Sequence, residues 1–309
     1  MNVIDMQDLK TEIKNVFDGE VKFDEPMSLH TSLKIGGPVE IMVFPEDPVS
    51  LKNVLVAAEK EGIPSFLFGA GTNLLVEDGG IHGIAISLKK FRSIEITRET
   101  DDRNVFLYVG SGVPLAMLIS FAKTNGYSGI EALAGIPGYL GGAVYMNAGS
   151  FGTEMKDVIT SVAIMDKHGE IMILKRDDIE FSYRCSNIPE GSVILSANII
   201  LKKDSPDKVE KRIKNFLGKK KTAQPLGELS AGCVFKNPEG NAAGKLIDDA
   251  ECKGMRVGGV EVSSVHANYF INRGNATFRE FTELMETVKA KVREFSGIEL
   301  EPEIRIIRG

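Results

Sequence analysis

One stretch of the chain, residues 129–149, limits the possible folds more than any other, because glycines recur through it among apolar residues (GIEALAGIPGYLGGAVYMNAG). A glycine inside a helix or strand costs about 0.5–1 kcal/mol relative to alanine. Such a density of glycine is unfavourable in a mere linker. The stretch therefore predicts that a flat or charged group lies close to this part of the backbone.

A second glycine turn lies earlier in the chain, in residues 66–75 (FLFGAGTNLL), directly after an apolar strand pattern. Two glycines one residue apart let backbone N–H groups approach a diphosphate, and Thr72 and Asn73 add side-chain donors. The turn differs from the Rossmann fingerprint, because Leu74 stands where the third glycine belongs and no helical pattern follows at once. Taken alone, this turn is more typical of a plain tight turn without a ligand.

The two glycine segments together resemble the FAD-binding domain of the vanillyl-alcohol-oxidase type, which implies an α+β fold with two FAD-binding subdomains. The resemblance implies cofactor contacts from both segments. The expected positions are Gly69, Ala70, Gly71, Thr72, Asn73, Gly135, Ile136, Pro137, Gly138, Gly141, Gly142, Ala143 and Asn147.

Helix and strand patterns alternate along the chain and favour mixed α and β structure. Cap and periodicity signals predict helices over residues 4–17, 48–61, 114–125 and 206–223, and a long helix that follows Thr277 and stops at Gly297. Strands are predicted at residues 65–68, 84–88, 105–109 and 298–307, with a hairpin over residues 162–174.

Composition excludes several classes of protein. The 309 residues are 43% hydrophobic, yet no run of about 18 apolar residues exists, so no membrane span is expected. A net charge of −6 argues against a nucleic-acid partner, and the basic run at residues 219–221 is typical of a solvated helix end. Three cysteines and four scattered histidines predict no metal site and no disulfide framework. We expect a cytoplasmic monomer.

Seven short motifs extend the resemblance to a specific family. In order they are HTSLKIGG (30–37), GAGTNLL (69–75), GIPGYLGGAVYMNAG (135–149), YRCS (183–186), AGCVFKNP (231–238), GKLID (244–248) and LEPEIR (300–305). They resemble the UDP-N-acetylenolpyruvoylglucosamine reductases, in the compact type II branch. This implies an FAD-binding domain over residues 1–203, an α+β substrate-binding domain over 204–300 and a C-terminal strand, 301–309, that returns to the FAD-binding domain.

The resemblance also implies a reaction and its residues: NADPH reduces the enolpyruvyl group of UDP-N-acetylglucosamine enolpyruvate in peptidoglycan precursor synthesis. The catalytic positions fall on Arg184, Cys233 and Glu303, and the substrate contacts on Tyr183, Asn237, Lys253 and His266. Position 233 is serine in the best-known members.

The chemistry agrees with these residue types. Hydride addition leaves negative charge beside a carboxylate, which a guanidinium fork and a protonated carboxyl group can stabilise. A thiol with an ordinary pKa near 8.5 is a stronger acid than a hydroxyl, so a cysteine can deliver the proton. Two alternatives remain at this point: a flavin oxidase of the same fold acting on an alcohol or sugar, and a non-catalytic protein that binds a nucleotide sugar.

Overall fold

The computed structural model describes residues 17 and 19–309, so the helix predicted over residues 4–17 lies, apart from Phe17, outside the described residues. The chain divides into two compact units. Among the described residues, the first unit comprises 17, 19–23, 41–69 and 83–218, and the second comprises 24–40, 70–82 and 219–309. The boundaries predicted at residues 204 and 300 stay predictions, because compactness does not define which part binds flavin and which binds substrate.

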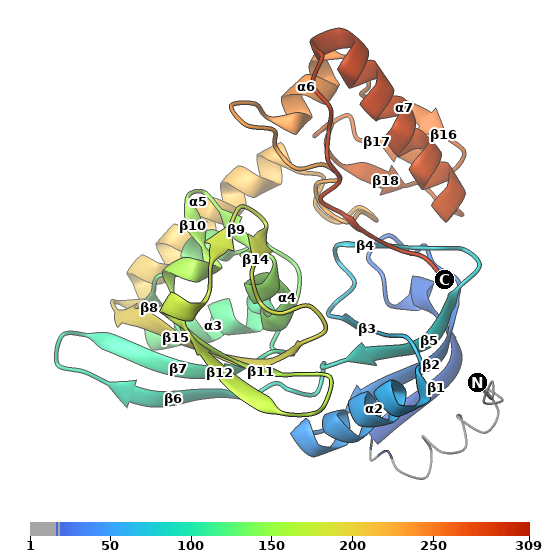
Figure 1. The fold of residues 1–309 in the computed structure, drawn as a ribbon. Helices are drawn as coiled ribbons and strands as arrows, with labels where there is room; N and C mark the ends of the chain where they lie inside the picture. The colour runs from blue at the N-terminus through green and yellow to red at the C-terminus, as the bar shows by residue number, and fades with distance from the viewer. Residues whose placement is uncertain (1–16, 18) are drawn as a thin grey trace. The chain divides into compact units, whose positions relative to one another are not determined.

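An antiparallel six-stranded sheet forms the centre of the first unit, with the path β12-β11-β15-β7-β6 and β8 paired to β15 (Figure 1). Its strands are β6 (Ile94–Glu99), β7 (Asn104–Gly110), β8 (Tyr127–Ser128), β11 (Ile159–Met165), β12 (Ile171–Lys175) and β15 (Val193–Lys203). The predicted hairpin is confirmed as β11 and β12, in which Val162 faces Leu174.

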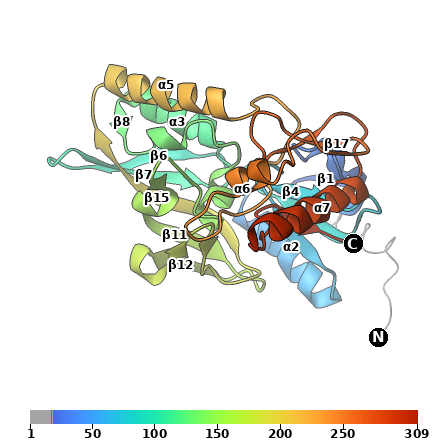
Figure 2. The same ribbon diagram turned by 90° about the horizontal axis from the view of Figure 1, so that it is seen from above.

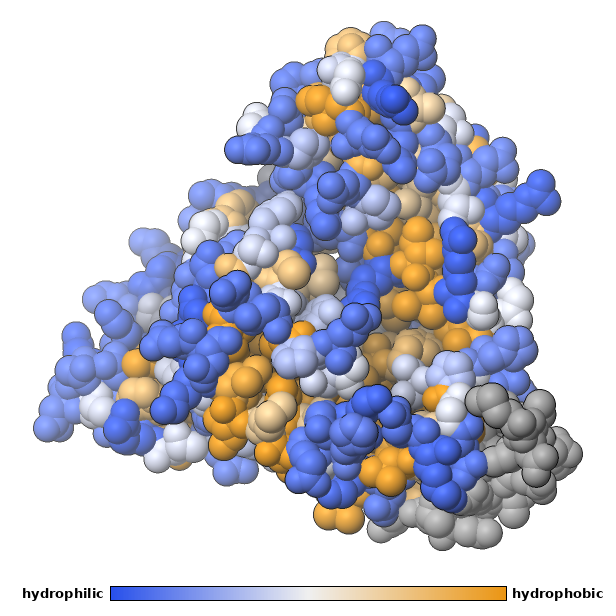
Figure 3. All heavy atoms as spheres, viewed as in Figure 1, coloured by the Kyte–Doolittle hydropathy of each residue, from blue (hydrophilic) through white to orange (hydrophobic). Residues whose placement is uncertain are grey.

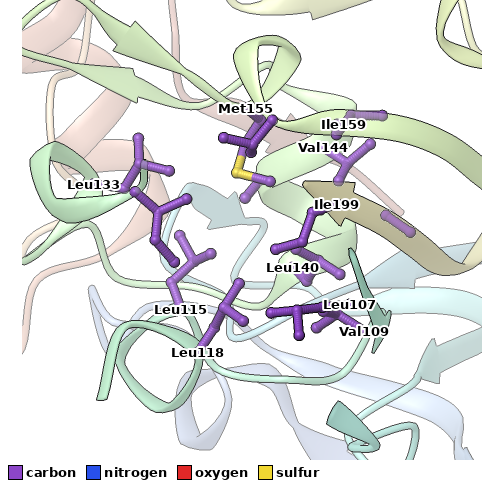
Figure 4. Packing of buried hydrophobic residues seen from close by; sticks show 14 of the residues in the cluster. Leu107, Val109, Leu115, Leu118, Leu133, Leu140, Val144, Met155, Ile159 and Ile199 are labelled. Carbon is purple, nitrogen blue, oxygen red and sulfur yellow. The ribbon is translucent and has the colours of Figure 1, made fainter. Parts of the chain in front are cut away.

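The core of this unit lies between the sheet and helices α3 (Leu115–Asn125) and α4 (Leu140–Tyr145). Figure 4 shows Leu115 and Leu118 of α3 and Leu140 of α4 pointing toward strand residues such as Leu107. Complete burial of a leucine or valine side chain contributes about 1.5–3 kcal/mol, so this cluster fixes the positions of the loops around it. α3 ends at Gly126, as predicted, and Gly126 adopts the left-handed conformation.

A second sheet has the strand order β1-β2-β5-β3, formed by β1 (Gly19–Pro26), β2 (Pro38–Pro45), β5 (Ile81–Ser87) and β3 (Ser65–Phe68). Helix α2 (Pro48–Glu61) packs its buried residues Leu51, Val54, Leu55 and Ala58 into the adjoining core. The predicted limits of α2 are confirmed: Asp47 Oδ1 accepts a hydrogen bond from Ser50 N at 2.8 Å, and Gly62 adopts a φ of +66°.

The second unit contains a three-stranded antiparallel sheet of β16 (Arg256–Val257), β17 (Val260–Val262) and β18 (Phe270–Asn272), with helices α6 (Ala243–Asp249) and α7 (Phe278–Ser296). Strands β4 (Leu74–Val76) and β19 (Arg305–Ile307) pair in parallel. Phe270 contacts Phe281 of α7, with ring centroids 5.5 Å apart. The capping box that predicted the start of α7 is present, since Thr277 Oγ1 accepts from Glu280 N.

Three expectations about single elements differ from the structure. Phe295 continues the helical spacing of apolar residues in α7, which predicts a buried side chain, but it is 60% exposed because the buried face ends at Val292. Lys220 is buried at 3% exposure although the basic run was expected to be solvated, and burial lowers its pKa to about 8. The C-terminal strand is shorter than predicted and begins at Arg305.

The remaining elements are short, apart from one helix that contains Lys220. They are α5 (Pro206–Ala223), β9 (Gly149–Ser150), β10 (Thr153–Glu154), β13 (Phe181–Ser182), β14 (Cys185–Ser186), η1 (Met27–Leu29), η2 (Glu131–Leu133), η3 (Met155–Asp157) and η4 (Arg176–Asp178). Figure 2 shows α3, α5 and the six-stranded sheet from above. None of the helices in the described part of the chain combines the length and the hydropathy that crossing a bilayer requires.

The surface is mainly hydrophilic, as Figure 3 shows for one face. Hydrophobic atoms gather on this face over β11 and β12, where Ile171, Met172 and Ile173 of edge strand β12 are 45–69% exposed. Single exposed apolar residues occur elsewhere and need no explanation.

Candidate active site

Arg184 occupies the tip of a two-residue turn in the first unit. Strands β13 and β14 pair Phe181 with Ser186 and Ser182 with Cys185, so Tyr183 and Arg184 form the turn. Arg184 has a φ of +57°, a conformation that costs a non-glycine residue about 1 kcal/mol or more. Its guanidinium carbon lies 4.9 Å from the centre of the Tyr183 ring, and Nη2 donates to Gly149 O at 3.5 Å. The turn therefore fixes Arg184 beside the end of the glycine-rich segment.

Asn147 connects this turn to the glycine-rich segment. Its side chain is completely buried, with Nδ2 donating to Ser182 O at 3.1 Å and to Glu154 Oε2 at 3.0 Å. Oδ1 accepts from Lys156 N at 3.1 Å. Both the nitrogen and the oxygen of the Asn147 amide are therefore hydrogen-bonded within the protein. The sequence predicted a cofactor contact for Asn147, and that contact stays a prediction. The structure shows a different role, which is to hold the Arg184 turn.

Replacing Asn147 with alanine is expected to lower the free energy of unfolding by about 3 kcal/mol, because buried groups that lose a partner cost about 1–3 kcal/mol each. Alanine is also less tolerant than asparagine of the φ of +41° found here. Urea unfolding followed by circular dichroism would measure the change. Asn125→Ala is the control, since the Nδ2 of this exposed asparagine donates to Phe121 O of its own helix. If Asn147→Ala lowered the free energy of unfolding no more than Asn125→Ala does, Asn147 would not hold the Arg184 turn.

The glycine-rich segment lies against residues 111–115 and leaves bare backbone on its outer side. Leu140 N donates to Val113 O and Gly141 N to Ser111 O, at 2.9 and 2.8 Å. A Cβ on Gly141 would lie 3.0 Å from Ser111 Cβ, whereas a Cβ on Gly142 would meet no atom within 4 Å.

Ser111 adds a polar group to this segment that the sequence had not singled out. Its hydroxyl oxygen is buried and forms no hydrogen bond with any of the described residues. Open space at Gly142 and an unpaired hydroxyl group on Ser111, which neighbours Gly141, both fit a large cofactor with polar atoms. The residues of this segment therefore suit the FAD that the sequence predicts.

The GAGTN turn divides between the units, with Gly69 in the first and residues 70–73 in the second. In the first unit, a Cβ on Gly69 would come no closer than 3.8 Å to the Tyr139 ring. In the second, a Cβ on Gly71 would lie 1.9 Å from His30 O, so the HTSLKIGG segment requires glycine here. Asn73 Nδ2 donates to Glu303 O at 3.1 Å. Three of the predicted motifs therefore meet within the second unit.

Cys233 and Glu303 lie on neighbouring extended segments of the second unit. Glu303 N and Ile304 N both donate to Val234 O, at 2.8 and 3.3 Å. Glu303 and Ile304 thus both lie opposite Val234, and two residues opposite one define a β-bulge. A bulge interrupts the regular alternation of side chains between the two faces of a strand. Ile304 is buried in the core with Val234, while Glu303 is only partly buried. The bulge thus lets Ile304 fill the core without burying Glu303 there.

Asn268 fixes the segment that carries Cys233. It is 1% exposed, its Oδ1 accepts from Phe235 N at 2.9 Å, and its Nδ2 donates to Phe235 O at 2.7 Å. Val234 N donates to Asn268 O at 2.8 Å. Next to these bonds, Cys233 faces Tyr269 in an antiparallel bridge. No sequence motif marks Tyr269, because only the fold brings it next to Cys233.

The other predicted substrate contacts of the second unit surround helix α6. Asn237 Oδ1 accepts from Ala243 N at 3.0 Å, and Lys253 Nζ donates to Asp248 Oδ2 at 2.6 Å. His266 packs so closely that a Cβ on Gly244 would lie 2.8 Å from its Cε1.

His266 is held in its neutral form. Burial lowers the pKa of His266, and the charge of nearby Lys253 adds to this effect. A neutral imidazole can donate or accept a hydrogen bond without carrying charge. The fourth predicted contact, Tyr183, lies on the Arg184 turn in the first unit and is 43% exposed.

Comparisons with known proteins agree with these observations. Residues 224–307 match the model of the C-terminal domain of UDP-N-acetylenolpyruvoylglucosamine reductase, and residues 39–175 match an FAD-binding domain. The UDP-N-acetylenolpyruvoylglucosamine reductase of Geotalea uraniireducens is 39% identical over 300 residues, 97% of this chain and 98% of that protein. That of Caldanaerobacter subterraneus is 39% identical over 291 residues, 94% of each chain.

A solved structure supports the same conclusion. The crystal structure of the UDP-N-acetylenolpyruvylglucosamine reductase from Thermus caldophilus superimposes with a TM-score of 0.80 and 31% sequence identity. The alignment covers 94% of this chain and 99% of that chain. The predicted fold class, including the FAD-binding domain, is confirmed.

Proposed function

The chain belongs to the UDP-N-acetylenolpyruvoylglucosamine reductase family, and we infer from this that it is an FAD-dependent oxidoreductase of peptidoglycan precursor synthesis. It reduces UDP-N-acetylglucosamine enolpyruvate to UDP-N-acetylmuramate with NADPH as the hydride donor. The observation that carries this conclusion is 39% identity to a reductase of this name over 97% of the chain.

We propose that FAD is held by the two glycine segments, at Gly69–Asn73 and at Gly135–Gly138, Gly141, Gly142, Ala143 and Asn147. The bare backbone at Gly142 and the unpaired Ser111 hydroxyl group support this assignment. When bound, FAD supplies the hydride that the side chains of the protein cannot carry.

We propose that three side chains stabilise and complete the reduction of the enolpyruvyl group. The Arg184 guanidinium binds the substrate carboxylate, where negative charge accumulates. Glu303 donates a hydrogen bond to the same group while it is protonated, a state that an anionic substrate favours. Cys233 delivers a proton to the neighbouring carbon. Tyr183, Asn237, Lys253 and His266 position the rest of the substrate.

Anaerobic stopped-flow absorbance tests the reaction directly. NADPH is expected to bleach the bound flavin, and the enolpyruvyl UDP-sugar is expected to restore its absorbance in the absence of oxygen. Restoration only by air would indicate an oxidase of the same fold, and a purified protein that takes up no FAD would indicate a non-catalytic binding protein. Either result would overturn the proposal. We further propose a cytoplasmic monomer, which sedimentation of the holoenzyme would test.

A further inference from the structure

Tyr269 lies opposite Cys233 with the geometry that brings two side chains closest together. The two residues form an antiparallel bridge, and the hydrogen bond between Val234 N and Asn268 O runs beside the pair, not within it. In such a pair the Cα atoms are about 4.5 Å apart and both side chains leave the same face. The phenol of Tyr269 can therefore reach the Cys233 side chain, and besides burial a hydrogen bond to Cys233 is one of the causes that raise the pKa of Tyr269.

The surroundings keep the Tyr269 phenol protonated. Burial raises the pKa of Tyr269, and the neighbouring Cys233 and Glu303 raise it further when they are ionised. The His266 ring packs edge-on against the phenol ring, with centroids 5.0 Å apart, and stays neutral because burial lowers its pKa. Tyr269 is therefore a hydrogen-bond donor over the whole working pH range.

Charged residues close in sequence to Cys233 and Glu303, and Lys253, form ion pairs of their own. Lys236 and Glu301, which flank Cys233 and Glu303 in sequence, form an ion pair with each other at 3.4 Å. Lys253 pairs with Asp248 at 2.6 Å. Glu303 acts electrostatically on Tyr269, and in the substrate-free enzyme an ionised Glu303 opposes the formation of a thiolate on Cys233. A hydrogen-bond donor to the Cys233 sulfur stabilises the thiolate both there and in the substrate complex, where Glu303 is protonated.

We propose that Tyr269 is a positioning residue whose hydroxyl group donates a hydrogen bond to the Cys233 sulfur and stabilises the thiolate left after proton transfer. The S–H bond breaks, the proton forms a C–H bond on the substrate, and the electron pair stays on sulfur. A proton from solvent then restores the thiol, while Tyr269 remains protonated. This role rests on the proposed function, because it matters only if Cys233 is the proton donor.

The hydrogen bond itself can be tested without any substrate. Alkylation of Cys233 by iodoacetamide in the oxidised holoenzyme, followed across pH by mass spectrometry of its peptide, reports the thiolate separately from Cys185 and Cys252. Tyr269→Phe keeps the ring and removes only the donor. The midpoint is expected to rise by about one to two pH units in this variant. Tyr127→Phe removes a buried phenol hydroxyl in the first unit and should leave the midpoint unchanged.

The catalytic consequence is measured in the half-reactions. Tyr269→Phe should slow reoxidation of the flavin by the enolpyruvyl sugar about three- to tenfold, since acid strength controls proton transfer, and should leave reduction by NADPH unchanged. An unchanged alkylation midpoint would overturn the hydrogen bond, and an unchanged reoxidation rate would overturn its part in the reaction. Failure of the proposed function would give a third result. The sugar would not reoxidise the flavin even in the unmodified enzyme, while Tyr269→Phe would still shift the alkylation midpoint of Cys233.

Discussion

Replacing Cys233 with alanine is expected to abolish turnover of the enolpyruvyl sugar while reduction of the bound flavin by NADPH continues at nearly its normal rate. The thiol protonates the carbanion that hydride transfer creates, and without that proton the hydride returns to the flavin, so loss of the thiol slows reoxidation and leaves reduction by NADPH unaffected. A positioned general acid contributes about 10²- to 10⁴-fold to the rate, and the reoxidation step should fall by that factor. Stopped-flow absorbance of the flavin separates the two steps.

Two further variants separate chemistry from packing. Cys233→Ser should keep measurable reoxidation by the sugar, because a hydroxyl group fills the same position and can also donate a proton. Cys252→Ala is the control: this thiol is completely buried, and burial raises its pKa, so it has no part in proton transfer. Both of its half-reactions should stay near normal. If Cys233→Ala slowed both half-reactions equally, Cys233 would be a structural residue.

Local signals in the sequence were sufficient wherever a helix end or a turn depends on one or two side chains. The limits of α2 follow from Asp47 and Gly62, and the start of α7 follows from Thr277, because caps satisfy backbone groups that the helix itself leaves unpaired. The hairpin of β11 and β12 was equally readable from its strand pattern.

Features that depend on distant contacts were not readable. The core around α7 ends at Val292, so Phe295 is exposed although it continues the helical spacing of apolar residues. Charge alone gave no sign that Lys220 is buried. Periodicity describes which residues share a face, but only the tertiary packing decides how far that face stays covered.

In the candidate site, too, local motifs identify some residues, whereas others are identified only by contacts between distant parts of the chain. Motif resemblance selected Cys233 and Glu303, but the bulge that turns Glu303 away from the core arises from two hydrogen bonds to Val234 O. Tyr269 and Ser111 lie outside the residues that the motifs selected, and their relevance comes from contacts across the fold. Resemblance therefore identifies reacting groups better than the residues that hold or tune them.

Replacing Arg184 with lysine is expected to slow reoxidation by the enolpyruvyl sugar about 10²- to 10³-fold, the loss found when one preorganised donor to a developing oxyanion is removed. Lysine keeps the charge but lacks the planar fork that binds a carboxylate through two hydrogen bonds. Both side chains meet the same backbone cost at the φ of +57°, so the free energy of unfolding should change little. Flavin reduction by NADPH should also stay within a few-fold of normal.

Arg176 offers a matched control for the Arg184 substitution within the first unit. Its Nε donates to Lys156 O at 3.2 Å and its Nη1 to Ile179 O at 3.0 Å, and its guanidinium carbon lies 5.1 Å from the centre of the Phe181 ring. Arg176→Lys should therefore lower stability and leave both half-reactions intact, the reverse of the pattern for Arg184→Lys. If Arg184→Lys retained reoxidation within threefold of normal, the substrate carboxylate would have to be bound by another group. The Arg184 guanidinium would then stabilise the turn, through its contacts with Gly149 O and the Tyr183 ring.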